Sequence, residues 1–322
     1  MKAIEVRTTG GPEVLQLVDL PVPRPKPHEV IVKVSRAGVN FIDVYQREGR
    51  YKLALPFILG QEGAGVVESS GTAVETVKTG DRVAWTGILG SYAQYAAIPS
   101  ERLVLIPSGV TEEQAAAAML QGMTAHYLIH DTYRLQKGQT ALVHAAAGGV
   151  GLLLVQMAHN LGARVIGTVS TEEKAALARE AGADEVVIYT KQDFEVEVKR
   201  IMGGKGLDVV YDGVGKDTFS QGLNLLRTRG MMVLFGGASG AVPPFDPLLL
   251  TQKGSLFLTR PSLPNYIEST EELRTRSQAV FAMIAAGRLK LRMERTYKLT
   301  EVQQAHRDLE GRKTTGKLLL LP

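Results

Sequence analysis

The stretch TALVHAAAGGVGLLLVQMA, residues 140–158, decides the fold of this chain. An apolar run of strand length leads into small residues, and an apolar run of helix length follows them. The spacing Ala146-x-Gly148-x-x-Gly151 is typical of the turn in a dinucleotide-binding β-α-β unit, with alanine in place of the first glycine. There, one glycine lets the backbone approach a pyrophosphate, another lets helix and strand pack closely, and free amides at the helix start face the anion. The stretch predicts a nucleotide site; an ordinary tight strand–helix turn is the alternative.

Strands and helices alternate from residue 140 onward, which predicts a doubly wound parallel sheet of the α/β class. A glycine at 182 stands where a helix C-terminal cap is expected. The expected strands after the first are 164–169, 185–189, 207–211, 231–235 and 255–259, with helices near 172–181, 194–202 and 216–226.

The first 120 residues are expected to be mostly β. Prolines at 21, 23, 25 and 27 punctuate an extended segment, and closely spaced glycines from 60 to 90 separate short strand-like runs, which suggests a small barrel-like domain. The tail returns to mixed structure, with a helix at 301–310 and a closing strand at 317–321. We therefore expect a catalytic domain at 1–122, completed by 262–322, and a dinucleotide-binding domain at 123–261.

Composition narrows the function classes. The 322 residues suit about two domains, and the net charge of +4 favours anionic small molecules without implying nucleic acid. With no cysteine, disulfide and thiolate chemistry are excluded, and His126 and His130 form an i, i+4 pair without a third nearby ligand, so we expect no metal site. No apolar run approaches the length of a membrane helix, and the default expectation is a cytoplasmic protein without membrane contact.

The end of the second strand indicates which nucleotide is bound. An acidic residue usually holds the free ribose 2′-hydroxyl of NADH there, but residues 168–171 read TVST. Ser170, a helix start and Lys174 favour the 2′-phosphate of NADPH, although a solvated helix cation is the alternative for Lys174. Tyr189, at the end of the third strand, could cover the phosphate or the adenine.

Two later strand exits are rich in glycine, YDGVG at 211–215 and FGGASG at 235–240. Ligands of such sheets bind beyond the carboxyl ends of the strands. As a set, these exits favour close approach of the backbone to a nicotinamide and its ribose, although each glycine alone could be merely structural.

Several motifs together carry a family resemblance. The segments NFIDVY (40–45), GQEGAG (60–65), GDRV (80–83) and VYDGVG (210–215), together with the turn at 145–151, resemble the medium-chain dehydrogenases/reductases. The segment KGSLFLTRPSL (253–263) is particularly similar to the zinc-independent NADPH:quinone oxidoreductases related to zeta-crystallin. The resemblance covers essentially the whole chain and implies a Rossmann sheet plus a GroES-like, mostly β catalytic domain.

The zinc alcohol dehydrogenases place a cysteine near the position of Asn40 and a histidine–glutamate pair after the glycine at 60. This chain has Asn40 and Gln61 there. Without a Lewis acid, alcohol oxidation is disfavoured, whereas a quinone or an activated enone needs less help because hydride addition gives a delocalised anion.

The resemblance also implies roles for individual residues. Asn40 would contact the nicotinamide ribose or the acceptor carbonyl, and Tyr45 and Tyr51 would line the acceptor pocket, with helix capping and core packing as the alternatives. The residues implied in cofactor binding are Asn40, Thr124, Gly148, Gly149, Val150, Ser170, Lys174, Tyr189, Gly213, Phe235, Gly236, Ser239 and Arg312. Relatives often have serine at the position of Gly213.

The leading hypothesis is an NADPH-dependent quinone reductase. A reductase of α,β-unsaturated carbonyls is a neighbouring alternative, since the same pocket logic serves both. A non-catalytic crystallin-like protein that binds NADPH or RNA is a third, which the lack of an aromatic-plus-basic motif disfavours. The last apolar strand, 255–259, is the open edge of the sheet, and family members pair such strands, so we expect a homodimer.

Overall fold

The computed structural model describes all residues from 1 to 322, and it divides into two compact units. Unit 1 comprises residues 1–123 and 267–322, and unit 2 comprises residues 124–266. Helix α2 (Glu112–Tyr127) begins in unit 1 and ends in unit 2. No helix is long and apolar enough to span a lipid bilayer.

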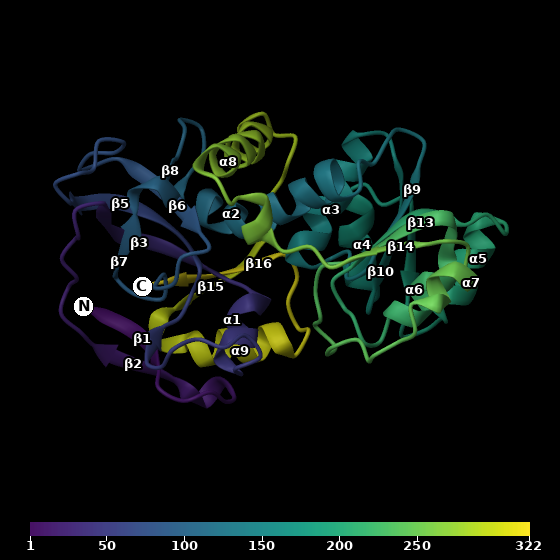
Figure 1. Cartoon of the computed structure of the whole chain (residues 1–322), viewed down its shortest axis with the longest axis horizontal. Helices are drawn as coiled ribbons and strands as arrows, with labels where there is room; N and C mark the ends of the chain where they lie inside the picture. Colours follow the sequence, from purple (N-terminus) through teal and green to yellow (C-terminus); the bar gives the residue numbers. More distant parts are fainter. The chain divides into compact units, whose positions relative to one another are not determined.

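Unit 2 is built on one six-stranded parallel sheet, shown in teal and green in Figure 1, with the order β11-β10-β9-β12-β13-β14. Helices α3 and α4 pack beside each other on one face, and α5 and α6 on the other. The doubly wound α/β fold predicted from the sequence is therefore confirmed. The strands are β9 (Thr140–Val143), β10 (Arg164–Val169), β11 (Glu185–Ile188), β12 (Leu207–Asp212), β13 (Leu226–Leu234) and β14 (Phe257–Thr259). The helices are α3 (Gly149–Asn160), α4 (Glu172–Glu180), α5 (Phe194–Met202), α6 (Phe219–Leu225) and α7 (Leu248–Gln252), with a π-helical turn at Leu128–Thr132 and a 3-10 turn at Leu263–Tyr266.

Two expected strands of unit 2 have different bounds. Strand β13 begins at Leu226, five residues before the expected start, because Leu226 pairs with Leu207 across a register shift. Arg229, inside that shift, takes a positive φ of 59°. Strand β14 begins two residues late because Ser255 also adopts a left-handed backbone, with φ 55°, in the turn that ends α7. Hydrophobic alternation alone does not reveal such left-handed residues.

Unit 1 contains a three-stranded sheet, β2-β1-β4, and a larger sheet in the order β15-β16-β3-β5-β6-β8, with β7 also paired to β3. Its strands are β1 (Lys2–Val6), β2 (Leu15–Asp19), β3 (Glu29–Val39), β4 (Phe57–Ile58), β5 (Glu62–Ser70), β6 (Arg82–Thr86), β7 (Tyr95–Pro99), β8 (Val104–Leu105), β15 (Met293–Lys298) and β16 (Lys317–Leu321). Its helices are α1 (Phe41–Arg47), α8 (Thr270–Ala285) and α9 (Val302–Glu310), with 3-10 turns at Pro12–Val14, Ser100–Arg102 and Leu299–Glu301.

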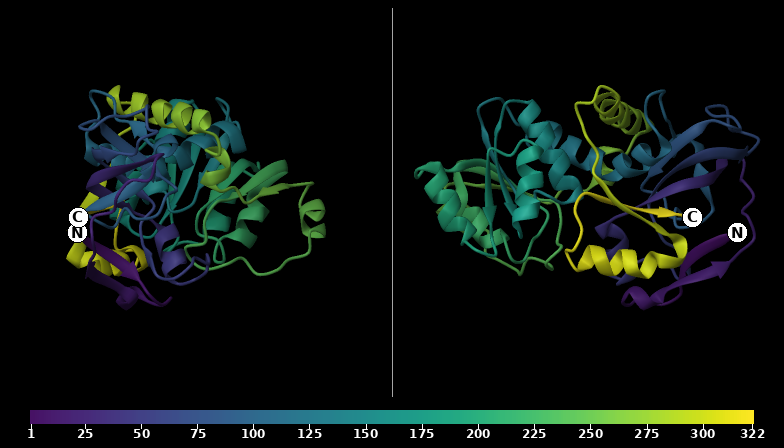
Figure 2. Two further views of the ribbon diagram at one scale, coloured as in Figure 1. Left: turned by 60° about the vertical axis from the view of Figure 1, so that its left-hand side comes forward. Right: turned by 180° about the vertical axis from the view of Figure 1, so that it is seen from behind.

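The C-terminal segment is an integral part of unit 1. Strand β16 is antiparallel to β3, with Leu318 opposite Val39 and Leu320 opposite Ala37. Both chain ends therefore lie in the same unit and close together, as both views of Figure 2 show. Apolar residues from the first, middle and last strands share one buried core, which includes Ile4, Val32, Trp85 and Leu320. Burial of this shared core holds the returning tail in place.

Candidate functional site

The turn at residues 145–151, between β9 and α3, has a backbone geometry that suits an anion, and we call it the anion cradle. Ala145 takes a left-handed φ of 52°, and Gly148 is the N-cap of α3. A Cβ on Gly151 would lie 2.2 Å from the carbonyl oxygen of Ala145, so only glycine lets the helix start this close to the turn. By helix geometry the first-turn amides, those of Gly149 and Val150 included, lack intrahelical acceptors. These two residues are only partly buried, and their unfilled donors fit a pyrophosphate.

The exits of β12 and β13 touch each other. A Cβ on Gly236 would lie 2.4 Å from the carbonyl oxygen of Gly213, and one on Gly213 would lie 2.9 Å from the Phe235 ring. Ser239 joins the two loops, because its Oγ donates to the Val214 carbonyl at 2.9 Å. The four predicted cofactor residues at these exits, Gly213, Phe235, Gly236 and Ser239, are therefore neighbours in space.

Asp212 holds the loop that follows β12 through hydrogen bonds. The side chain is fully buried at the end of β12. Its Oδ1 accepts from the amides of Val214 and Gly215 at 2.8 and 3.0 Å, and its Oδ2 accepts from Thr218 Oγ1 at 2.8 Å. A carboxylate held by several such donors fixes the backbone of the glycine turn. The sequence analysis did not assign this residue a role.

The ends of β10 and β11 bring the predicted phosphate residues to one edge. Val169 pairs with Ile188, so Ser170 and Tyr189 leave neighbouring strands at the same level. The Tyr189 amide donates to the Val169 carbonyl at 3.0 Å, and its side chain is 40% exposed. Lys174 lies in the first turn of α4, where its amide donates to the Thr171 hydroxyl at 3.3 Å. Ser170, Tyr189 and the first turn of α4, which carries Lys174, therefore lie at the same carboxyl-terminal edge of the sheet.

Two further predicted cofactor residues, Thr124 and Arg312, lie in different parts of the fold. Thr124 is buried in α2, at the first position of unit 2. Arg312 belongs to unit 1, in the turn after α9, with a left-handed φ of 56°.

Asn40 ends β3 and begins α1 in unit 1, and it is only 3% exposed. Its Nδ2 donates to Glu62 Oε2 at 2.8 Å and to the Gly38 carbonyl at 3.4 Å. Its Oδ1 accepts from Lys317 Nζ at 2.7 Å and from Gln121 Nε2 at 3.3 Å. The amide therefore has a partner for each of its four hydrogen-bonding positions.

Tyr45 and Tyr51 are brought together, as an acceptor pocket with aromatic walls would require. Their rings meet edge to face with centroids 5.7 Å apart. Tyr51 is 45% exposed, and the guanidinium of Arg50 lies 5.3 Å from the Tyr45 ring centroid. An exposed, paired aromatic edge can pack against a flat organic molecule.

A buried polar chain runs from the start of α1 to α9. Asp43 Oδ2 accepts from the backbone N–H of Asn40 at 2.8 Å and from the Tyr92 hydroxyl at 2.9 Å, and the Tyr92 hydroxyl lies 3.4 Å from His306 Nε2. Burial raises the pKa of Asp43 to about 7, against the stabilising hydrogen bonds from Asn40 and Tyr92. Burial, assisted by the charge of Arg47, lowers the pKa of His306 to about 3.

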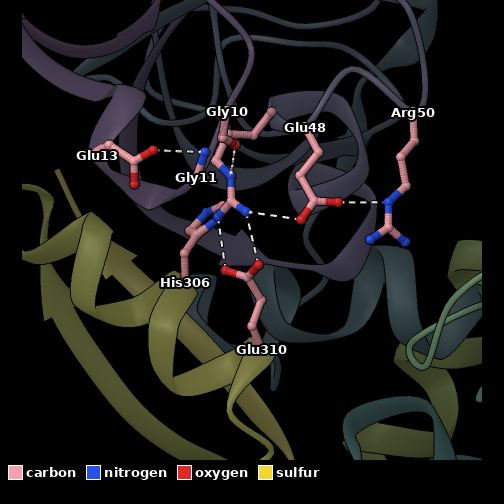
Figure 3. A network of polar contacts seen from close by, with 8 residues as sticks. Gly10, Gly11, Glu13, Glu48, Arg50, His306 and Glu310 are labelled. Atoms are coloured by element: carbon pink, nitrogen blue, oxygen red, sulfur yellow. Dashed lines mark hydrogen bonds and ion pairs between the residues drawn. The ribbon is translucent and has the colours of Figure 1, made fainter.

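Arg47 is the last member of this series of polar contacts. Figure 3 shows its partners His306, Glu310, Glu48 and Gly10. Its guanidinium donates to both carboxylate oxygens of Glu310 at 2.8 and 2.9 Å, to the Gly10 carbonyl at 3.0 Å and to Glu48 Oε1 at 3.4 Å. It also lies 3.2 Å from His306 Nδ1. Since arginine can only donate, His306 carries its proton on Nε2.

The side chains do not gather a metal-binding set. No group of three or more His, Cys, Asp or Glu residues is placed to hold a metal ion. His126 near the end of α2 and His130 in the π-helical turn that follows have their ring centroids 4.5 Å apart, with the ring planes tilted by 48°. Glu62, which follows Gln61 at the start of β5, is engaged with Lys317 and the Leu120 amide.

Sequence reasoning assigned no role to Glu62 or Lys317, although both contact Asn40. The pairing registers explain the meeting, because Gly63 lies opposite Ala37 and Leu318 lies opposite Val39. Lysine at the head of an otherwise apolar closing strand, KLLLL, was the one local signal that this strand begins at a polar site.

Comparisons with known proteins agree with this architecture. The alcohol dehydrogenase GroES-like domain family matches residues 26–108, and the zinc-binding dehydrogenase family matches residues 149–272. The quinone oxidoreductase of Pseudomonas aeruginosa is 45% identical over 323 residues, which cover 100% of this chain and 99% of that protein. A 2-haloacrylate reductase of a Burkholderia species is 41% identical, with 99% of this chain and 98% of that protein covered.

A solved structure shares the whole fold. The crystal structure of Escherichia coli quinone oxidoreductase complexed with NADPH superposes with a TM-score of 0.98 at 44% identity, and the match covers 100% of both chains. The likeness extends over both units and confirms that the chain contains a GroES-like domain and a parallel sheet.

Proposed function

Since this chain belongs to the quinone oxidoreductases of the medium-chain dehydrogenase/reductase superfamily, we propose that it is an NADPH-dependent quinone reductase that needs no metal ion. The observation that carries the proposal is the anion cradle at the start of α3, with the glycine exits of β12 and β13 beside it in the sheet order. Full-length identity of 44–45% to quinone oxidoreductases supports the substrate class.

When bound, NADPH supplies the hydride. The amides of Gly149 and Val150 would hold its pyrophosphate, and Gly213 and Gly236 would let the backbone approach its nicotinamide half. Ser170, Lys174 and Tyr189 would hold the 2′-phosphate. Thr124, Phe235, Ser239 and Arg312 complete the proposed cofactor set.

The acceptor would lie flat against Tyr45 and Tyr51, with Asn40 at the head of α1. A quinone gains a hydride and a proton, and hydride addition leaves a delocalised anion that solvent can protonate. Asp43 and His306 are fully buried, so neither can give a proton directly to the acceptor, and we assign no general acid in unit 1. The residues would therefore act by positioning and by excluding water.

The test is oxidation of NADPH followed at 340 nm with a panel of quinones, enones and 2-haloacrylate. We expect quinones to give the highest kcat/KM. The 41% identity to a 2-haloacrylate reductase favours enone reduction as the second candidate, and a preference for enones would select it. Binding of RNA without turnover of any acceptor would overturn both enzyme functions.

Lys174 is expected to determine the preference for NADPH over NADH. Replacing it with alanine should weaken NADPH binding by roughly tenfold to a hundredfold, the range for a lost hydrogen bond to a charged group, and leave NADH binding nearly unchanged. Fluorescence titration of both cofactors measures the change. Lys199→Ala is the control, since that lysine pairs with Glu195 on α5. Equal losses for the two cofactors would remove Lys174 from the phosphate site.

We also propose a homodimer formed along the edge of β14, and a cytoplasmic location that cell fractionation would test. In unit 2, β14 pairs with β13 and ends the sheet, and Phe257 is 55% exposed on it. An apolar edge strand can pair with a second copy. Sedimentation at micromolar concentration should give about twice 34.8 kDa, and Phe257→Glu should shift the protein toward the monomer. A monomeric wild type would contradict the dimer.

A further inference from the structure

Three neighbouring strands of unit 1 place a buried ion pair beside Asn40. Strand β3 lies between β16 and β5, and Asn40, Lys317 and Glu62 stand at the same end of the three strands. Lys317 Nζ donates to Glu62 Oε2 at 2.5 Å, with the side chains 3% and 0% exposed. A buried ion pair stabilises the fold little more than apolar residues would, so stability alone does not explain why this pair lies here.

The backbone makes room for this pair. Gly38 lies opposite Leu319, one residue from the strand end. A Cβ on Gly38 would lie 2.1 Å from Glu62 Oε2 and 2.8 Å from Lys317 Nζ. A larger residue at position 38 would therefore push the two charges apart.

The two charges permit only one orientation of the Asn40 amide. An ammonium group can only donate and a carboxylate can only accept. Lys317 therefore requires the oxygen of Asn40 on its side, and Glu62 requires the nitrogen. A flipped amide would face each charge with the wrong group, and it would lose two charge-assisted hydrogen bonds.

In this orientation Asn40 can offer a ligand its oxygen but not its nitrogen. Both N–H groups are used by buried acceptors, Glu62 Oε2 and the Gly38 carbonyl. The oxygen is shared between Lys317 at 2.7 Å and Gln121 at 3.3 Å. Gln121 is a partly buried side chain that can turn away for a ligand, whereas the Gly38 carbonyl is buried backbone of β3 and stays in place.

We propose that the Glu62–Lys317 ion pair is a positioning device that holds Asn40 with its oxygen toward the ligand, so that Asn40 accepts a hydrogen bond from a ligand hydroxyl. This inference rests on the proposed function, in which the ribose next to the nicotinamide supplies that hydroxyl. It decides between the two roles considered for Asn40, contact with the nicotinamide ribose and contact with the acceptor carbonyl. A carbonyl needs a hydrogen-bond donor, and both N–H groups of Asn40 are already used.

The experiment compares binding of NADPH with binding of an analogue that lacks the hydroxyls of the nicotinamide ribose, by fluorescence titration without turnover. Wild type should bind NADPH about tenfold more tightly than the analogue, as one lost hydrogen bond predicts. Asn40→Ala should bind both alike. The charge-neutral double variant Glu62→Gln, Lys317→Met removes the orienting charges and should also lose the discrimination.

Two further variants test the proposal independently of the double variant, and one of them is a control. Gly38→Ala retains both charges but separates them, and it should reduce the discrimination even if the double variant folds poorly. Glu310→Gln breaks a partly buried ion pair of the same unit, with Arg47, and should leave the discrimination unchanged. Full discrimination in folded Gly38→Ala or in the double variant, or equal binding of both ligands by wild type, would overturn the positioning role. A wild type that binds no NADPH would instead contradict the proposed function.

Discussion

Replacing Arg47 with methionine is expected to lower the free energy of unfolding by about 3 kcal/mol, the lower end for breaking a buried ion pair. Its side chain is 1% exposed, and its donors contact Gly10, Glu48, His306 and Glu310. Removing the guanidinium takes a donor from each of these acceptors, although Glu48 keeps Arg50, and it removes the direct polar contact between α1 and α9. Chemical denaturation of the full chain measures the loss.

Arg50→Met is the matched control for that experiment. Arg50 also pairs with Glu48, at 2.6 Å, but its side chain is 50% exposed. Exposed pairs contribute less than about 1 kcal/mol. Similar losses in the two variants would show that the network around Arg47 does not hold the C-terminal segment in place.

Asp43 and His306 are expected to give the free energy of unfolding two opposite dependences on pH. Asp43 has a pKa of about 7 in the folded state against an ordinary value of 3.8, so the folded state keeps a proton that the unfolded chain releases. Its stabilisation is complete below pH 3.8 and is lost as the pH rises through about 7. His306 has a folded pKa of about 3 against 6.5. Its stabilisation is complete above pH 6.5 and is lost as the pH falls toward 3.

The two effects oppose each other between about pH 4 and 6.5, so they largely cancel in the pH dependence of the wild-type free energy of unfolding. Relative to wild type, Asp43→Asn should gain stability as the pH rises, by about 1.4 kcal/mol per pH unit. His306→Gln should lose stability with rising pH at a similar slope. Urea denaturation at several pH values gives both slopes, and groups common to all variants cancel in the differences. Parallel curves for the three proteins would show that neither group is titrated abnormally.

The parallel sheet could be predicted because its signals are local. Each strand of unit 2 is a short apolar run, and each helix begins or ends at a recognisable residue, such as Thr171 before α4 or Gly182 after it. The candidate at Gly148 followed from the glycine spacing, the one at Ser170 from the lack of an acidic residue at the end of the second strand, and the one at Gly213 from the rule that ligands of such sheets bind beyond the carboxyl ends of the strands. Their roles in binding stay predictions.

No such rule predicted the contacts among the polar residues of unit 1. Glu62 looked like part of a family motif, and Lys317 looked like the first residue of a closing strand. Their contact joins residues 255 positions apart, and that of Arg47 with Glu310 joins residues 263 apart. No periodicity or spacing predicts which charges meet over such separations.

The sequence by itself determined the class of the fold and the place of the anion cradle, because apolar periodicity and glycine spacing act between residues close in the chain. The tertiary structure alone decided which way the Asn40 amide points and which groups surround Asp43 and His306. Those properties depend on strand register and on burial, and both arise only when the last strand of the chain pairs with β3.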